Sequence, residues 1–317
     1  MTFDLSGKRV FVAGHGGLVG GALVRRLATE DCEILTAPRE ALDLRRQADV
    51  EAWMQDARPQ AVFLVAARQA GLLGHTEAPA EILHDNLMIQ TNVIEAARRC
   101  GVQKLIFTGS AAAYPLDAAQ PVTEDALLTG PPEPAHAFYA AAKIAGIKLC
   151  QAYRGQYGCD FIVAMPGNLY GPGAKYGSAA ANVVPALIER FHAATAEGAA
   201  EVVIWGTGEA RRDFLYGDDC ADALVHLMRV HSDEAPVNVG SGRETTIADL
   251  AGAVAAATGF KGRLIFDPRK PEGAARRTLD ISRLTAMGWA PRTPLNDGLT
   301  QTCAAFAATN RAANGRG

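Results

Sequence analysis

The chain has 317 residues, of which 49% are hydrophobic and 21% charged, and its formal net charge is -3 at pH 7. These values are typical of a globular protein, and a slightly acidic chain has no general attraction to nucleic acid or to anionic lipid. An anionic ligand must therefore be bound by local positive groups, which favours a small molecule over a polymer.

The sequence predicts neither a membrane anchor nor a metal site. The N-terminal segment MTFDLSGKRVFVAG leads directly into a strand pattern, without the regions of a signal peptide, and no run of about eighteen apolar residues occurs. The six cysteines are scattered, without a CxxC pair or a histidine at metal-ligand spacing, and predict reduced thiols. We expect a cytoplasmic homodimer that binds neither membrane nor nucleic acid.

Short apolar runs alternate with longer stretches of helical periodicity in the first half of the chain. This alternation predicts an α/β fold, a doubly wound parallel sheet of the Rossmann type with helices on both faces. In chain order, the expected strands are Arg9–Ala13, Glu33–Thr36, Ala61–Val65, Lys104–Gly109 and Phe161–Met165. The expected helices are Gly17–Thr29, Asp49–Gln55, Pro79–Cys100 and Phe138–Tyr157.

After Pro166 the composition of the sequence changes. The segment GNLYGPGAKYGSAA is rich in glycine and small residues, which predicts an irregular loop. We expect a dinucleotide-binding domain over residues 1–166. Residues 167–317 would form mainly a smaller, mixed α/β substrate-binding lobe, with some segments returning to the first domain. That lobe would contain a helix at Val183–Ala196, a strand at Glu201–Trp205 and a helix at Asp218–Val230. Substrate would lie between the two lobes, beyond the carboxyl ends of the strands.

The stretch VFVAGHGGLVGGALVRRL reads as a strand, a glycine turn and the start of a helix, with glycines spaced G-x-x-G-x-x-G. Glycine there permits a tight turn, close approach of backbone N–H groups to a pyrophosphate, and close packing of the helix on the strand. An ordinary strand-to-helix turn is the alternative, but the position after the first strand favours dinucleotide binding. The residues expected to contact the cofactor here are Gly14, Gly17, Leu18, Val19, Gly20 and Ala66.

The end of the second strand predicts the choice of cofactor. An NAD enzyme commonly places a carboxylate there to bind the ribose hydroxyls, but the run CEILTAPRE has none where the strand ends. Arg39 follows at once, and a guanidinium can bind a 2′-phosphate through two hydrogen bonds. We therefore predict NADP, with a solvated surface arginine as the alternative interpretation of Arg39.

Three residues form a candidate catalytic set: Ser110 after the fourth strand, and Tyr139 and Lys143 on the next helix. The four-residue spacing places the phenol and the ammonium on one helical face. A free tyrosine has a pKa of about 10, and a nearby cation lowers it. Tyr139 could then act as the general acid in ketone reduction, with Ser110 bonding the same substrate oxygen and Lys143 also reaching the nicotinamide ribose.

A glycine turn on the first strand, a serine after the fourth and a Tyr-x-x-x-Lys on the next helix together resemble the extended short-chain dehydrogenase/reductases, which include nucleotide-sugar epimerases, dehydratases and reductases. Longer segments resemble one branch of that class, the GDP-L-fucose synthases, which epimerise GDP-4-keto-6-deoxy-mannose at two carbons and reduce it with NADPH. These segments are GHGGLVG, AARQAG, DNLMIQTNVIEAA, PEPAHAFYAAAKIAGIKLC, GNLYGPG, VVPALIERFHAA, VVIWGTGEARRDFLYGDD and LDISRLTAMGW.

The resemblance spans nearly the whole chain and implies roles for further residues. It implies that Ser110, Tyr139 and Lys143 are catalytic. The substrate contacts that it implies are Asn168, Arg190, Trp205, Arg212 and Arg277. The three arginines would supply the positive charge that a diphosphate requires. Trp205 could stack on a base or sugar, or could equally be a half-buried core aromatic.

The chain departs from that branch at two positions where epimerisation needs a proton carrier. The branch has a cysteine two residues after the catalytic serine and a histidine just before the Val-x-Pro of the substrate helix, whereas this chain has Ala112 and Asn182. A methyl group and a carboxamide cannot carry protons at pH 7. His136, Lys175 or Tyr176 could replace the missing groups, so relocated epimerisation remains open.

Other differences are smaller. Gly16 stands where the branch has an arginine near the cofactor phosphate, which weakens the argument for NADP. His75, His84 and His192 are interpreted as helix-surface or packing residues.

The sequence favours an NADPH-dependent 4-ketoreductase acting on a nucleotide-linked, most simply GDP-linked, 4-keto-6-deoxy sugar without 3,5-epimerisation. A full epimerase/reductase with relocated acid and base is the first alternative. An NAD-dependent nucleotide-sugar 4-epimerase is the second, and Arg39 argues against it. A non-enzymatic dinucleotide sensor is the third, and the intact Ser110, Tyr139 and Lys143 argue against it.

Overall fold

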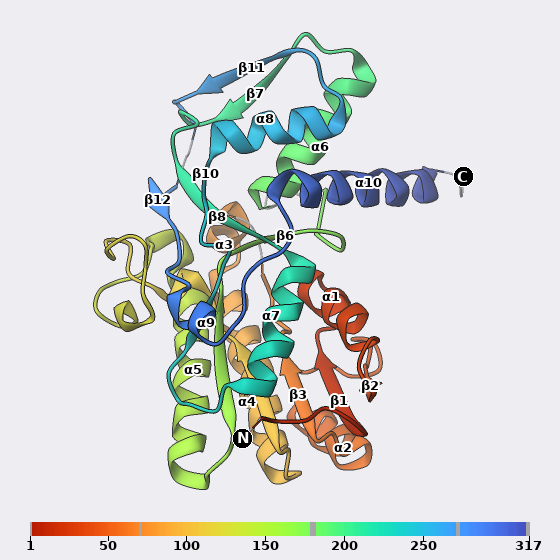
Figure 1. The fold of residues 1–317 in the computed structure, drawn as a ribbon, viewed down its shortest axis with the longest axis vertical. Helices are drawn as coiled ribbons and strands as arrows, with labels where there is room; N and C mark the ends of the chain where they lie inside the picture. The colour runs from red at the N-terminus through yellow and green to blue at the C-terminus, as the bar shows by residue number, and fades with distance from the viewer. Residues whose placement is uncertain (1, 70–71, 178–181, 271–272, 315–317) are drawn as a thin grey trace.

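The computed structural model describes residues 2–69, 72–177, 182–270 and 273–314, which form two lobes, one above the other in Figure 1. The lower lobe contains a six-stranded sheet in the order β2-β1-β3-β4-β5-β9, with every neighbouring pair parallel. Its strands are β1 (Lys8–Ala13), β2 (Cys32–Leu35), β3 (Ala61–Leu64), β4 (Lys104–Thr108), β5 (Phe161–Pro166) and β9 (Val237–Val239). The α/β class and the doubly wound sheet are confirmed.

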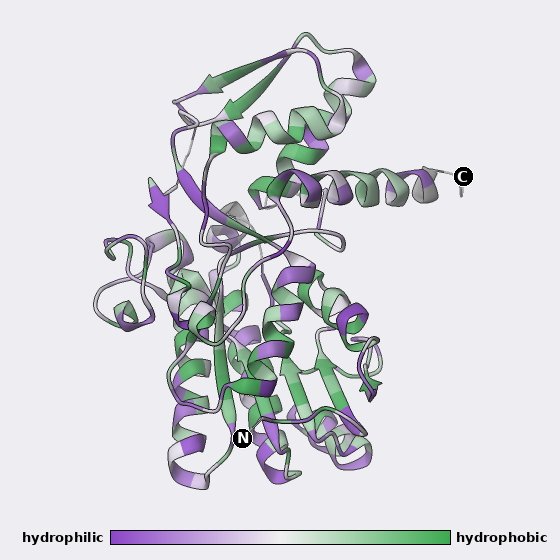
Figure 2. Ribbon diagram, viewed as in Figure 1, coloured by the Kyte–Doolittle hydropathy of each residue, from purple (hydrophilic) through white to green (hydrophobic). Residues whose placement is uncertain are grey.

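Helices cover both faces of this sheet. Side chains alternate along each strand, so each face has its own set of apolar residues for the helices to cover. Phe11 and Ala13 pack on the face covered by α2 (Gln47–Ala57), α4 (Pro79–Arg99) and α5 (Ala137–Tyr157). Val10 and Val12 pack on the other face, covered by α1 (Leu18–Leu27) and α7 (Gly217–Val230). Figure 2 shows the hydrophobic strands enclosed between these helices.

The helix expected at Asp218–Val230 does not belong to the second lobe. It is α7, which packs beside α1 and buries Ala221, Leu224 and Met228 in the same core as the sheet residues. β9 follows α7 and pairs with β5 at the edge of the sheet. The chain therefore enters the second lobe at β6 and returns to the first lobe at α7. It returns because α7 has an apolar stripe, which is buried against the open face of the sheet.

The second lobe is built around β8 (Arg211–Tyr216). This strand pairs in antiparallel fashion with β10 (Glu244–Thr246) and in parallel with β6 (Asn168–Tyr170) and β12 (Arg276–Arg277). β7 (Glu201–Trp205) and β11 (Arg263–Asp267) form a separate parallel pair. A core of their apolar residues is closed by α6 (Val183–Glu197), α8 (Ile247–Thr258) and α10 (Leu295–Asn314).

The remaining elements are short. They are the helices α3 (Leu72–Glu77) and α9 (Ser282–Ala286), and the 3-10 turns η1 (Ala111–Ala113), η2 (Glu124–Ala126) and η3 (Pro134–His136). Within the described ranges, no helix has both the length and the apolar character needed to cross a membrane.

The sheet has a switch point at β1, whose two neighbours are β2 on one side and β3 on the other. The chain runs from β1 to β2 on one side and from β2 to β3 on the other side. In open α/β sheets, ligands bind at such a point beyond the carboxyl ends of the strands, and the glycine turn follows β1 at this point.

Candidate active site

The turn between β1 and α1 is held close to the end of β3. Gly14 has a φ of 99°, and a Cβ atom on it would lie 2.7 Å from the backbone of Ala66. A Cβ atom on Gly20 would collide with the carbonyl group of Gly14. Gly17 caps α1 without any side-chain hydrogen bond to its first turn. A helix N-terminus approached only by glycine backbone is a fitting site for the pyrophosphate of a dinucleotide.

The first residue of α7 and the loop after β6 reach this turn. A Cβ atom on Gly217 would lie 2.7 Å from Cδ2 of Leu18, and a Cβ atom on Gly173 would lie 3.5 Å from its Cα. Leu18 is therefore a contact between the lobes as well as a residue of the glycine turn. The predicted cofactor residues Gly14, Gly17, Leu18, Gly20 and Ala66 come together at one place.

Arg39 lies just beyond β2 with its side chain exposed. The pKa of Asp43 is well below its ordinary value, chiefly because Arg45 donates a hydrogen bond to it, and Arg39 adds a smaller Coulombic contribution. Gly16 faces open space, since nothing lies within 4 Å of a Cβ atom built on it. An exposed guanidinium near this end of the sheet can donate hydrogen bonds to a 2′-phosphate without breaking an internal hydrogen bond.

The predicted catalytic residues meet at the carboxyl end of β4. Ser110 lies just after this strand, and its Oγ accepts a hydrogen bond of 3.2 Å from the backbone N–H of Ala112. Tyr139 and Lys143 lie on the first turns of α5, and Ser110 lies close enough to Tyr139 to affect the pKa of its phenol. Nζ of Lys143 lies 5.8 Å from the centroid of the Tyr139 ring.

The expectation that Lys143 lowers the pKa of Tyr139 is wrong for this structure. Burial raises the pKa of Tyr139 above its ordinary value, and the side chain of the nearby Ser110 offsets only part of that rise. Burial also lowers the pKa of Lys143 to about 7. The low-polarity surroundings penalise both charged forms, so the phenol is held protonated at neutral pH, as a proton donor must be.

A cluster of titratable side chains adjoins Tyr139. The ring of His75, on α3, lies 5.2 Å from that of Tyr139 and 4.9 Å from that of His136, measured between centroids. Nδ1 of His136 lies 3.1 Å from Oε2 of Glu133, which also lies 3.2 Å from the guanidinium of Arg277. The pKa of Glu133 is lowered, first by its hydrogen bond with His136 and then by Arg277.

Sequence reasoning missed His75 as a neighbour of the catalytic tyrosine. No motif marks it, because its position depends on how α3 packs against η3. The sequence does mark His136, which precedes Tyr139 by three residues.

Two of the expected substrate arginines lie side by side at the border of the lobes. Arg277 on β12 and Arg212 on β8 are register partners in the parallel pair. Arg277 contacts Glu133 and so links this strand pair to the histidine cluster beside Tyr139. Asn168, on β6, donates a hydrogen bond of 3.1 Å to the carbonyl of Asp213 on β8. These three side chains therefore lie on the neighbouring strands β12, β8 and β6, and Arg277 connects them to the cluster beside Tyr139.

Arg190 and Trp205 form a second group, in a hollow of about 470 Å³ between α6 and β7. The guanidinium carbon of Arg190 and Nζ of Lys270 each lie 6.0 Å from the centroid of the Trp205 ring. The indole is 40% exposed, so it is not a core aromatic. Exposed aromatic surface flanked by cations suits a flat, anionic ligand such as a nucleotide.

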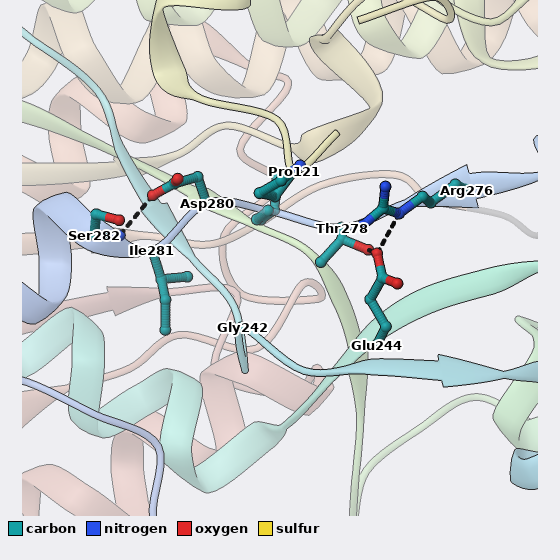
Figure 3. A pocket seen from close by; sticks show the side chains of 9 residues that line it. Pro121, Gly242, Glu244, Arg276, Thr278, Asp280, Ile281 and Ser282 are labelled. Atoms are coloured by element: carbon teal, nitrogen blue, oxygen red, sulfur yellow. Dashed lines mark hydrogen bonds and ion pairs between the residues drawn. The ribbon is translucent and has the colours of Figure 1, made fainter. Parts of the chain in front are cut away.

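Another hollow, of about 280 Å³, lies between β10, β12 and α9 (Figure 3). Its ionic groups are already hydrogen-bonded: Arg276 pairs with Glu244, which also accepts a hydrogen bond of 2.8 Å from Thr278, and Asp280 accepts one of 2.8 Å from the backbone N–H of Ser282. None of the predicted catalytic, cofactor or substrate residues lines it. This hollow is therefore not part of the candidate active site.

Ala112 and Asn182, the two positions expected from the sequence to lack a proton carrier, lie at different places in the fold. Ala112 lies in the 3-10 turn directly after Ser110, and Asn182 is the exposed cap residue of α6. Of the possible replacements, Tyr176 packs its ring 4.5 Å from that of Phe306 on α10, which assigns it to the core of the second lobe.

His192 likewise packs against Phe306, with ring centroids 5.2 Å apart, as expected for a packing residue. Lys175 is exposed.

Comparison with known proteins agrees with this architecture. The profile of the family described as NAD dependent epimerase/dehydratase matches residues 10–240. A GDP-L-fucose synthase of Sinorhizobium fredii is 50% identical over 302 residues, which cover 95% of this chain and 96% of that protein.

Two solved structures from Campylobacter jejuni are similar over almost their whole length. A GDP-6-OMe-4-keto-L-xylo-heptose reductase superposes with a TM-score of 0.90 at 30% identity, covering 98% of this chain and 100% of that one. A GDP-mannoheptose C4 reductase with NADP bound superposes with a TM-score of 0.86 at 32% identity, covering 95% and 98%. The chain therefore belongs to the NAD dependent epimerase/dehydratase family.

Proposed function

We propose that this protein reduces the 4-keto group of a GDP-linked 4-keto-6-deoxy sugar with NADPH and leaves the neighbouring carbons unchanged. One observation carries the proposal: Ser110, Tyr139 and Lys143 are assembled, while Ala112 beside them has no group that could carry a proton. The names of the similar proteins support a GDP-linked substrate, and the reductase with NADP bound supports the cofactor.

The described residues can be assigned to the parts of both ligands. The glycine turn and the first turn of α1 would hold the cofactor pyrophosphate, and Arg39 its 2′-phosphate. Arg212 and Arg277 would bind the diphosphate of the sugar nucleotide. Arg190 and Trp205 would hold its base, since they share a hollow with exposed aromatic surface. Asn168 would contact the sugar.

The bound nicotinamide would supply a hydride to C4 of the sugar. Tyr139 gives its phenolic proton to the oxygen at C4, so the carbonyl becomes a hydroxyl and the phenol becomes a phenolate. Ser110 donates a hydrogen bond to the same oxygen and orients it. Lys143, buried beside the Tyr139 ring, would reach the ribose of the nicotinamide and so hold the cofactor next to Tyr139.

A full epimerase/reductase is the second candidate. The observation in its favour is the 50% identity with a protein named GDP-L-fucose synthase. It would require proton carriers other than Ala112 and Asn182. An NAD-dependent 4-epimerase is less consistent with the exposed Arg39 beyond β2.

The test is to mix the purified protein and NADPH with a panel of GDP- and UDP-linked 4-keto sugars. We expect loss of NADPH absorbance with a GDP-4-keto-6-deoxy sugar, and a product whose configuration at C3 and C5 is that of the substrate by NMR. A product inverted at those carbons would identify the full epimerase/reductase. NAD that remains bound through purification would identify the 4-epimerase.

A further inference from the structure

A route of titratable side chains leads from the catalytic tyrosine toward the surface. The rings of Tyr139 and His75 are neighbours at 5.2 Å, and those of His75 and His136 at 4.9 Å, between centroids. His136 then contacts Glu133 at 3.1 Å. The residues come from three elements, α3, η3 and α5, together with the residue that caps η3.

His136 is the most exposed group of this route, since the side chain of Glu133 is only 12% exposed. Tyr139 and His75 are each only 5% exposed, whereas the side chain of His136 is 22% exposed. Lys143, the other titratable neighbour of Tyr139, is 2% exposed and donates its hydrogen bond to the backbone of Thr108. The histidines therefore lead toward water, and the lysine side chain does not.

The chemistry of these groups suits proton transfer. Imidazole gains and loses a proton near neutral pH and can donate through one nitrogen while it accepts through the other. Glu133 is held ionised, since His136, Arg277 and Arg212 all lower its pKa. A carboxylate at 3.1 Å stabilises the positive charge of His136 whenever that ring is protonated.

We propose that His75 and His136, supported by Glu133, return a proton from solvent to Tyr139 after each reduction, an inference that rests on the proposed function. The phenolate left by ketone reduction takes the proton of a protonated His75, which is replaced from His136, and His136 from water. Each step breaks one N–H or O–H bond and forms another, and no electrons are exchanged. His75 and His136 act through Tyr139 and take no part in the hydride step.

The experiment separates the first turnover from later ones. Tyr139 begins protonated, so the variants His75→Asn and His136→Asn should keep the first-turnover rate of NADPH oxidation. Their steady-state rate should fall by about tenfold or more and should recover as imidazole is added. His84→Asn is the control, because His84 lies on α4 with a side chain that is 70% exposed, and it should match the wild type.

Four results would overturn the inference. An equal slowing of the first and later turnovers would show that the histidines only support the structure, and an unchanged steady-state rate in both variants would show that protons arrive by another route. Deuterium from the solvent that enters carbons beside the ketone in wild type but not in His136→Asn would make His136 an acid or base on the substrate. If neither wild type nor His84→Asn oxidises NADPH with any keto sugar, the proposed function itself fails, and this inference fails with it.

Discussion

The ammonium group of Lys143 donates a hydrogen bond of 2.7 Å to the carbonyl oxygen of Thr108, the last residue of β4. This bond directs a buried cation toward the sheet, and Nζ also lies 4.7 Å from the centroid of the Phe107 ring. One hydrogen bond and two aromatic rings do not replace the hydration of an ammonium group, so its pKa falls from 10.5 to about 7.

That pKa predicts how stability depends on pH. Between about pH 7 and 10.5, the unfolded chain holds a proton on Lys143 that the folded chain has lost, so this residue makes the free energy of unfolding rise with pH. Its unfavourable contribution is fully present below pH 7. Denaturation of the cofactor-free wild type and of Lys143→Met should show that the substitution raises the free energy of unfolding most below pH 7. The difference in free energy of unfolding between the two proteins should shrink by up to about 1.4 kcal/mol per pH unit above pH 7. Parallel curves for the two proteins would contradict the shift.

Tyr139→Phe removes the proposed proton donor and keeps the ring. Turnover should fall by about 10² or more, with little change in the melting temperature, because the ring still fills its buried site. Steady-state assays and thermal unfolding of both proteins measure the two effects. Turnover close to that of the wild type would refute the assignment of Tyr139 as general acid.

Arg39→Ala tests the choice of cofactor. NADPH binding should weaken by about tenfold or more, and NADH binding should change little, because only NADPH carries the 2′-phosphate. Titration of each cofactor against wild type and variant gives the two ratios. Equal weakening of both cofactors would show that Arg39 has a structural role.

Gly20→Ala tests the close packing of α1 on the glycine turn. A Cβ atom there meets the carbonyl of Gly14, so the turn must move, and we expect loss of dinucleotide binding or of folded protein. Gly16→Ala is the matched control four residues earlier, because its Cβ would have nothing within 4 Å. Cofactor titration and melting curves of both variants check this; equal behaviour of the two would contradict it.

Much of this arrangement was predictable because it depends on local pattern. β1 to β5, the glycine turn and the positions of Ser110, Tyr139 and Lys143 follow from strand and helix periodicity, and their bounds differ from the expected ones by a residue or two. The contacts of His75 depend on how α3 packs against η3, and the return of α7 to the first lobe depends on which faces the other helices leave uncovered. Neither the contacts of His75 nor the position of α7 can be predicted from the residues next to them in the sequence.

The burial of Lys143 could not be anticipated for the same reason. The spacing of Tyr139 and Lys143 places them on one face. Only the packed structure shows that α5 packs this face against β4 and that burial is the largest influence on both pKa values.

The departure at Ala112 and Asn182 leads to the last prediction. An enolising site must exchange the protons beside the ketone, because the proton it removes equilibrates with the general base and then with solvent. Turnover in deuterated water should therefore place no enzyme-dependent deuterium at C3 or C5, measured by NMR against a blank without enzyme that corrects for slow spontaneous exchange. Deuterium at either carbon would show that the lost proton carriers have been replaced and would favour the full epimerase/reductase. The double variant Ala112→Cys with Asn182→His should restore some exchange, since it returns two titratable groups to these positions; the single variant Asn182→His is its control.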